Sequence, residues 1–321
     1  MPEQIIVDVE HLDKQYKKQK VVRDAGFQVK QGSICGLIGP NGAGKTTIMK
    51  MLGGLVVPTA GTISLYGAGT EEELARARSR MSFMIETPYL KMNLTAKQNL
   101  EKQRLQKGVP DKARIDEVLE LVGLDGVGNK RVKEYSLGMR QRLGIANAML
   151  AKPELMILDE PVNGLDPEGI VEIRELLVKL NKEQNITIMI SSHILSELSQ
   201  MCSDYIFIQK GQIIRDITDE ALKNECRSFL GIHTDNDALA LAVLWEKLHT
   251  DNYEVREDGS IKLFDYLEDV LTVSKTLYEN GVIPLELYMG GENLEEYYMS
   301  MMGGNADVEY NESPAVSAKE R

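Results

Sequence analysis

Cysteine is scarce in this sequence of 321 residues, which contains three. Their positions show neither the pairing of a disulfide framework nor the spacing of a metal site. We therefore expect reduced thiols packed inside a cytosolic protein; they are Cys35, Cys202 and Cys226. Histidine is also rare, and its four positions form no metal-binding pattern: His11, His193, His233 and His249.

Long hydrophobic runs and an excess of positive charge are missing as well. No uninterrupted apolar stretch approaches the ~20 residues needed to span a bilayer. The start of the chain, MPEQIIVDVEHLDKQYKKQK, lacks the basic-then-apolar order of a secretion signal. A net charge of −12 argues against nucleic acid as a partner. A membrane partner stays open, because docking on another subunit needs only a local patch.

The hydrophobic pattern predicts an α/β protein. The content of hydrophobic residues (43%) and charged residues (27%) is that of an ordinary globular protein. The length allows one large α/β domain and a smaller one. Two apolar runs, 155–160 and 186–191, read as strands buried on both faces, and a helix at 168–183 joins them. We further expect two strands within 21–39, separated by a glycine turn, and single strands at 61–67 and 81–85. A helix is expected over 45–53. From about 88 to 150 the pattern is helical, with its clearest helix at 111–123.

The last third of the chain has a different order of elements. A hairpin around Lys210-Gly211 is predicted over 205–216. Beyond it, residues 228–289 alternate in the order β-α-β-β-α-β, which suggests a small ferredoxin-like module. The stretch NLEEYYMSMM closes this module as a helix, and the polar end of the chain is expected to be disordered.

A phosphate-binding loop follows the second predicted strand. Residues 39–47, GPNGAGKTT, fit the pattern G-x-x-x-x-G-K-[ST] between a strand and a helix. The glycines let backbone amides approach phosphate oxygens, Lys45 offers a charge to the β- and γ-phosphates, and Thr46 offers a hydroxyl to Mg²⁺. A glycine-rich turn with an exposed lysine is the alternative, and the flanking elements argue against it. The expected nucleotide-binding residues are Gly39, Pro40, Asn41, Gly42, Ala43, Gly44, Lys45, Thr46 and Thr47.

Two adjacent acids end the buried strand LMILDE. Asp159 would hold Mg²⁺, usually through water, and Glu160 would polarise an attacking water molecule. Acids at strand ends are common, but these lie 114 residues after the lysine of a phosphate-binding loop. The combination predicts hydrolysis of a nucleoside triphosphate.

The stretch SLGMRQR, residues 136–142, opens an apolar helix with positive charge. Ser136 is a candidate N-cap. Arg140 and Arg142 add charge to an end where the helix dipole is already positive. A helix start built for stability alone would carry acids there, so we expect an anion at this end.

In the order of these motifs, residues 4–220 resemble the ATP-binding cassette (ABC) ATPase family. YSLGMRQR stands where the family places its signature motif: Ser136 and Gly138 match the core of that motif, whereas Leu137 and Met139 depart from its commonest form. The resemblance implies that this helix start caps the γ-phosphate of ATP bound by the other subunit of a head-to-tail dimer. The missing anion would then be a phosphate on a second chain.

The resemblance assigns three further positions. Tyr16 lies where an aromatic ring stacks on adenine, a contact worth about 1–3 kcal/mol by analogy with base stacking; a surface tyrosine is the alternative. In NGLDP, residues 163–167, Asp166 would face the partner subunit. In SSH, residues 191–193, His193 would contact the γ-phosphate, so the catalytic set becomes Glu160, His193 and Lys45.

One position departs from the wider family. FMIETP carries Glu86 where the family usually has glutamine. An ionised glutamate can only accept hydrogen bonds. It could ligate Mg²⁺ beside Thr46 and Asp159. Without a metal ion, it would be repelled by a γ-phosphate. Glu86, the signature stretch, ISSHILSE and the trailing module are similar to the bacitracin and lantibiotic resistance branch of ABC exporters. We expect Glu86 to link metal-nucleotide occupancy to a permease-docking segment at 87–95.

These resemblances imply a P-loop ABC core with a helical subdomain (about 88–150) in residues 1–220, an accessory α+β domain at 221–303 and a tail at 304–321. The chain is expected to hydrolyse Mg-ATP as a homodimer on the cytoplasmic face of the membrane, driving efflux of a peptide antibiotic through a separate permease. Transport of another substrate or in the other direction stays open. A non-transport ABC protein acting on ribosomes usually fuses two cassettes, whereas this chain has one P-loop. A DNA-repair ATPase would need a long coiled coil between Lys45 and Asp159, where 114 residues leave no room.

Overall fold

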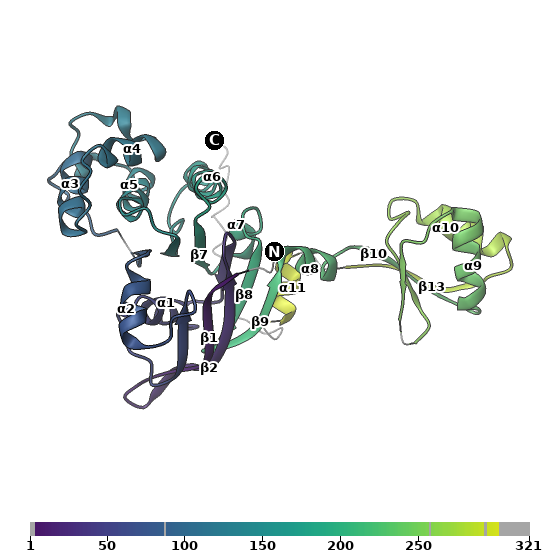
Figure 1. The fold of residues 1–321 in the computed structure, drawn as a ribbon. Coiled ribbons are helices and arrows are strands. Elements are labelled where there is room, and N and C mark those ends of the chain that lie inside the picture. The colour runs from purple at the N-terminus through teal and green to yellow at the C-terminus, as the bar shows by residue number, and fades with distance from the viewer. Residues whose placement is uncertain (1–3, 87, 257, 292–293, 302–321) are drawn as a thin grey trace, which may run out of the picture. The chain divides into compact units, whose positions relative to one another are not determined.

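The computed structural model describes residues 4–86, 88–256, 258–291 and 294–301. The chain divides into two compact units, Met1–Leu222 and Lys223–Arg321, and Figure 1 labels many of their helices and strands. Within the described residues, no helix combines the length and the apolar character needed to cross a membrane. The expected disordered tail, 304–321, lies outside the described residues.

A six-stranded sheet organises the first unit. Its order is β5-β6-β7-β3-β8-β9, with parallel pairing throughout except between the last two strands. Every residue of β6, β7 and β3, three of the four inner strands, is buried, which explains their largely apolar sequences. The strands are β3 (Ile34–Ile38), β5 (Met81–Met84), β6 (Leu155–Asp159), β7 (Thr187–Ser192), β8 (Asp204–Gln209) and β9 (Gln212–Thr218).

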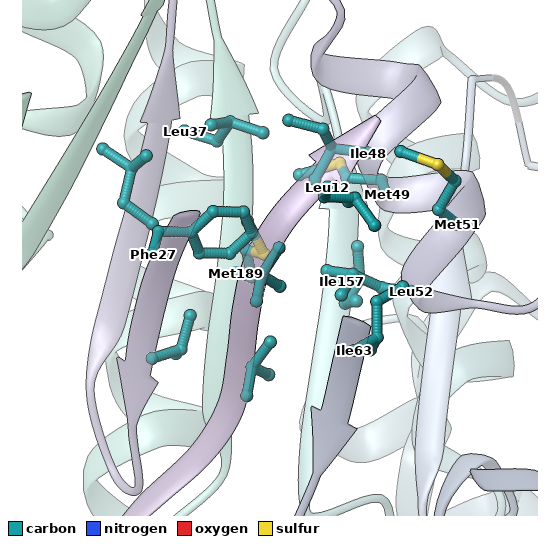
Figure 2. Close-up of a cluster of buried hydrophobic side chains, with 14 of the residues drawn as sticks. Leu12, Phe27, Leu37, Ile48, Met49, Met51, Leu52, Ile63, Ile157 and Met189 are labelled. Carbon is teal, nitrogen blue, oxygen red and sulfur yellow. The ribbon is translucent and has the colours of Figure 1, made fainter. Parts of the chain in front are cut away.

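A second, antiparallel sheet packs against the first through a shared core. Its order is β2-β1-β4, formed by β1 (Ile5–Tyr16), β2 (Gln19–Lys30) and β4 (Ala60–Leu65). Side chains from both sheets and from helix α1 (Lys45–Leu52) meet in one apolar cluster, and truncating one of them to alanine typically costs ~2–5 kcal/mol. Figure 2 labels Leu12, Phe27, Leu37, Ile48, Met49, Met51, Leu52, Ile63, Ile157 and Met189 of this cluster.

The helical stretch between β5 and β6 holds three helices that contact one another. Its clearest predicted helix, 111–123, is shorter in the structure because Asp111 accepts a 2.9 Å hydrogen bond from the Ala113 amide in a turn before the first helical residue. The helices of the first unit are α1, α2 (Glu71–Arg78), α3 (Ala96–Gln106), α4 (Arg114–Leu121), α5 (Leu137–Met149), α6 (Pro167–Gln184) and α7 (Leu195–Leu198). Helix α8 (Asp219–Glu225) spans the boundary of the two units.

The second unit has the order of elements that the sequence predicts. Four antiparallel strands form a sheet in the order β11-β12-β10-β13, and α9 and α10 pack on its apolar face. This arrangement is a ferredoxin-like fold. Its elements are β10 (Phe229–Thr234), α9 (Asp237–Leu248), β11 (Tyr253–Val255), β12 (Ile261–Leu263), α10 (Val270–Glu279), β13 (Pro284–Gly290) and α11 (Leu294–Met301).

Candidate nucleotide-binding site

Strand register brings the predicted site residues to one edge of the six-stranded sheet. The loop 39–44 leaves the carboxyl end of β3, and Ile38 pairs with Ser192 of β7. On the other side of β7, Ser191 pairs with Asp159 of β6. The carboxyl ends of parallel strands are where ligands bind in open α/β sheets. The register therefore places the glycine-rich loop, the acidic pair and His193 side by side.

The glycine-rich loop forms a small pocket at this edge. Gly42 and Gly44 have left-handed φ angles of 79° and 112°, which side chains disfavour. Gly44 is the N-cap of α1, so the first amides of that helix face the pocket without a capping side chain. The pocket has a volume of about 190 Å³ and is lined by Val21, Pro40, Asn41, Gly42, Ala43, Gly44, Lys45, Thr46, Thr47 and Glu160.

Lys45 is buried and held by its own loop. Its Nζ donates hydrogen bonds to the carbonyl oxygens of Gly39 at 2.5 Å and Pro40 at 3.4 Å. The same ammonium lies 3.1 Å from Glu160 Oε1. That oxygen is buried and accepts no hydrogen bond from the described residues, so we treat the contact as an ion pair with imperfect geometry. An incoming anion could take over the ammonium from Glu160.

Thr46 and Asp159 form an oxygen-rich corner that fits Mg²⁺. Thr46 Oγ1 donates to Asp159 Oδ2 at 2.7 Å, and Ser191 Oγ donates to Asp159 Oδ1 at 2.6 Å. Across the described part of the chain, no group of three His, Cys, Asp or Glu side chains could hold a metal ion. A hydroxyl and a carboxylate supplemented by phosphate and water oxygens are the ligands that Mg²⁺ takes at phosphate sites.

Glu160 links the lysine to the histidine. Its Oε2 lies 2.9 Å from His193 Nδ1, and its backbone amide donates to Ser191 Oγ at 2.9 Å. Glu160 has a left-handed φ of 48°, a strained conformation for a residue with a side chain. Ser191, which the sequence did not single out, thus holds Asp159 and the Glu160 backbone together.

The helix start at SLGMRQR has the predicted serine cap. Ser136 is the N-cap of α5 and accepts a 3.2 Å hydrogen bond from the Met139 amide. Arg140 donates to the carbonyl oxygens of Val132 at 3.4 Å and Lys133 at 3.2 Å, and Arg142 lies 3.6 Å from a Glu172 oxygen. Arg140 thus has two neutral carbonyl partners and Arg142 has one carboxylate partner, and an anion at this helix start stays a prediction.

The loop 163–167 packs beside this helix start. Asp166 is the N-cap of α6 and accepts a 3.0 Å hydrogen bond from the Gly169 amide. A Cβ atom placed on Gly138 would lie 3.8 Å from Leu165, and one on Gly164 would lie 3.4 Å from Leu137. The two motifs thus lie against each other within one chain.

Tyr16 and Glu86 lie outside the phosphate pocket. Tyr16 ends β1, is 45% exposed, and has the Lys14 ammonium 4.9 Å from its ring centroid. Glu86 Oε1 accepts a 2.8 Å hydrogen bond from Lys50 Nζ. This contact holds the pKa of Glu86 below its usual range and raises the pKa of Lys50. Glu86 is thus bound to Lys50, which the sequence analysis did not single out.

A third residue whose role the sequence did not predict supports the glycine-rich loop from outside. Gly211, in the turn between β8 and β9, donates its amide to the Ala43 carbonyl at 2.9 Å. Its φ is +85°, and a Cβ atom there would lie 2.3 Å from the Val21 carbonyl oxygen. The glycine in the predicted hairpin was the available signal, but its contact with a loop so distant in sequence was not predictable.

Comparisons with known proteins agree with this site. Residues 22–163 match the family model described as ABC transporter. The chain is 42% identical to the bacitracin transport ATP-binding protein BcrA of Bacillus licheniformis, covering 93% of this chain and 98% of that protein. It is 43% identical to the lantibiotic transport ATP-binding protein SrtF of Streptococcus pyogenes, covering 65% of this chain and 89% of that protein.

A solved structure shows the same fold. The ATP-binding cassette MJ0796, a dimer bound to ADP and Pi, superposes with a TM-score of 0.60 and 25% identity, covering 66% of this chain and 98% of that one. The predicted P-loop ABC core is therefore confirmed. The chain belongs to the ATP-binding proteins of ABC transporters and, as a member of that family, binds ATP and hydrolyses it.

Proposed function

We propose that the chain is the ATPase subunit of an exporter that removes bacitracin-like peptide antibiotics from the membrane. The observation that carries this proposal is the extent of the likeness to BcrA, which runs over 299 residues and so includes the second unit. The likeness to the lantibiotic protein stops at 209 residues. Bacitracin is therefore the first substrate to test, and a lantibiotic the second.

The glycine-rich loop holds the phosphates of ATP in this proposal. Its backbone amides and the Lys45 ammonium surround the β- and γ-phosphates, with Lys45 exchanging Glu160 for phosphate oxygens. Thr46 and Asp159 would hold Mg²⁺, which neutralises charge on the phosphates during transfer. Tyr16, exposed at the end of β1, is available to stack on the adenine.

Glu160 is the proposed general base. Once Lys45 is engaged by phosphate, the Glu160 carboxylate is free to accept a proton from an attacking water molecule. His193, 2.9 Å from that carboxylate, orients it and contacts the γ-phosphate. Because one residue contacts both the P-loop lysine and the histidine, nucleotide binding and activation of the base are coupled through Glu160.

A second copy of the chain completes the site in this proposal. Ser136 and Gly138 at the start of α5 would contact the γ-phosphate bound by the partner, and Asp166 would lie at the same interface. The close packing of the loop 163–167 against α5 supports a joint role of the two motifs. We infer that ATP joins two chains head to tail and that hydrolysis separates them.

The proposed membrane partner is a separate permease, which places the chain on the cytoplasmic face of the membrane. Of the four apolar residues in the proposed docking segment, Tyr89 and Met92 are exposed, whereas Leu90 and Leu94 are half-buried. None of the four belongs to the fully buried core. Two exposed apolar side chains beside the helical stretch are available to a cytoplasmic helix of the permease.

The test is a resistance assay in a bacterium sensitive to bacitracin. Cells express this chain together with the membrane protein encoded beside it, which we expect to have about six apolar spans. The wild-type pair should raise the inhibitory concentration of bacitracin, and Glu160→Gln should abolish the increase. If the wild-type pair protects against neither bacitracin nor a lantibiotic while ATP is hydrolysed, the proposed substrate class is wrong.

A further inference from the structure

Lys50 and Glu86 come from different elements and meet beside the proposed metal corner. Lys50 follows Thr46 by four residues on α1, so both side chains lie on the same face of the helix. Glu86 lies two residues beyond β5, whose Met84 pairs with Leu158 of β6. It therefore reaches the level of the acidic pair at the carboxyl edge of the sheet. Glu86 is the expected metal ligand of the sequence analysis, whereas Lys50 has no part in the proposed chemistry so far.

The contact between the two side chains is close and specific. The Lys50 ammonium lies 2.8 Å from Glu86 Oε1, and the Lys50 side chain is 33% exposed. Glu86 has a φ of 62°, in the left-handed region that residues with side chains rarely adopt. The Glu86 side chain is 66% exposed. The ion pair thus joins a residue with a strained backbone to the helix that carries Thr46.

The negative charge of Glu86 is neutralised by Lys50. A free carboxylate close to the phosphate pocket would repel a nucleotide that carries no metal. Paired with Lys50, the carboxylate is neutralised. A divalent cation held near Thr46 and Asp159 would compete with Lys50 for the same carboxylate, because Lys50 lies one helical turn from Thr46 on the same face of α1.

We propose that Lys50 is a positioning residue that sets the magnesium dependence of nucleotide binding by holding the Glu86 carboxylate until a divalent cation replaces it. This inference rests on the proposed binding of Mg-nucleotide at Thr46 and Asp159. The proposal predicts opposite effects on nucleotide affinity without and with magnesium. Without Lys50, nucleotide alone should bind more weakly, and nucleotide with magnesium should bind as well as before or more tightly.

The test measures ADP binding to the full-length protein by calorimetry, once with magnesium chloride and once with EDTA. Lys50→Met should raise the ratio of the two affinities by about threefold to tenfold, which is the range expected for one partly exposed ion pair acting in both directions. Lys50→Arg keeps the charge and should restore the wild-type ratio. Lys97→Met removes an exposed lysine that pairs with Asp116 at 2.6 Å and should leave the ratio unchanged.

Glu86→Gln separates the proposed role from a general effect of charge. In that background the carboxylate is gone, so Lys50→Met should no longer change the ratio of affinities. Lys50→Gln is the second variant should Lys50→Met fail to fold, as judged by circular dichroism. An equal change in both affinities, no change in either, or a persistent effect of Lys50→Met in Glu86→Gln would overturn the proposal. Failure of wild-type protein to bind ADP in both conditions would instead refute the proposed nucleotide site.

Discussion

At the scale of the residue, Glu160 and Lys45 hold each other in a position that ATP must disrupt. The ammonium is surrounded by two carbonyl oxygens of its own loop and one carboxylate oxygen. Phosphate offers the ammonium several oxygens with more charge, so the exchange is favourable. The cost of freeing Glu160 is small because its Oε1 accepts no well-formed hydrogen bond in the described structure.

The types of the site residues were predictable, but their contacts were not. The spacing of the P-loop identifies Lys45 and Thr46, and the strand-end position identifies Asp159 and Glu160. The pairing of Glu160 with Lys45 depends on the register of three strands, which no local pattern contains. Glu86, the expected metal ligand, is paired with Lys50, a partner that no local pattern indicated.

Tyr66 offers a stability prediction with a pH dependence. Its hydroxyl is buried and has no hydrogen-bond partner among the described residues. Its ring lies 3.9 Å from the Arg80 guanidinium, and burial raises its pKa from 10.0 to about 12. Tyr66→Phe keeps the ring and removes the unpaired hydroxyl. We expect it to raise the free energy of unfolding by about 1 kcal/mol at neutral pH.

The alkaline behaviour of Tyr66→Phe should differ from that of the wild type. A raised pKa in the folded state means that this tyrosine's contribution is complete below pH 10 and is lost as the pH rises toward about 12. The stability advantage of Tyr66→Phe should therefore grow above pH 10. Urea unfolding followed by circular dichroism measures it, and Tyr16→Phe, at an exposed tyrosine, is the control. An advantage that shrinks with rising pH would contradict this explanation.

At the scale of the element, the turn between β8 and β9 supports the phosphate-binding loop. We expect Gly211→Ala to weaken nucleotide binding several-fold, because a Cβ atom 2.3 Å from the Val21 carbonyl must displace the turn that bonds Ala43. Gly67→Ala is the control: Gly67 has a similar left-handed φ of +79°, and a Cβ atom added there would have no described atom within 4 Å. It should lose stability of about 1 kcal/mol from backbone strain and keep nucleotide affinity. Equal affinities for ADP in both variants would show that the turn does not position the loop.

The start of α5 should act on the partner chain rather than on its own nucleotide. In a Glu160→Gln background, which is expected to retain ATP, Ser136→Arg should prevent ATP-driven dimerisation because it places bulk and charge at the interface. Binding of ATP to the monomer should survive, since the P-loop of that chain is unchanged. Ser136→Ala loses only the helix cap, at a cost of about 1 kcal/mol, and should still dimerise. Size-exclusion chromatography with ATP distinguishes the two, and a dimer of the Ser136→Arg protein would contradict the interface.

Strands that are buried at every residue could be predicted from the sequence. Strands β3, β6 and β7 are buried at every position, so their apolar runs were unambiguous. Helix ends were less predictable, because side-chain turns such as that of Asp111 decide them. The contacts of Arg140 and Arg142 at the start of α5 were not predictable either, because only the folded chain brings their oxygen partners close.

At the scale of the whole molecule, the two units each have their own apolar core, so we predict that they unfold separately. The single tryptophan, Trp245, lies on α9 of the second unit and reports only on that unit. ADP binds the first unit in our proposal, so it should raise the transition midpoint seen by circular dichroism and leave the Trp245 fluorescence transition in place. A chain ending at Asp219 should still bind ADP. A common shift of both transitions would contradict two independent units.

The account rests most heavily on Glu160 as the residue that activates water. The most direct measurement is the steady-state turnover of Mg-ATP by purified wild-type protein and Glu160→Gln, with ATP binding measured on the same samples. Loss of a general base should lower the rate by ~10²–10⁴ while binding persists, whereas Lys45→Ala should weaken binding itself. Hydrolysis by Glu160→Gln at the wild-type rate would show that another group activates the water.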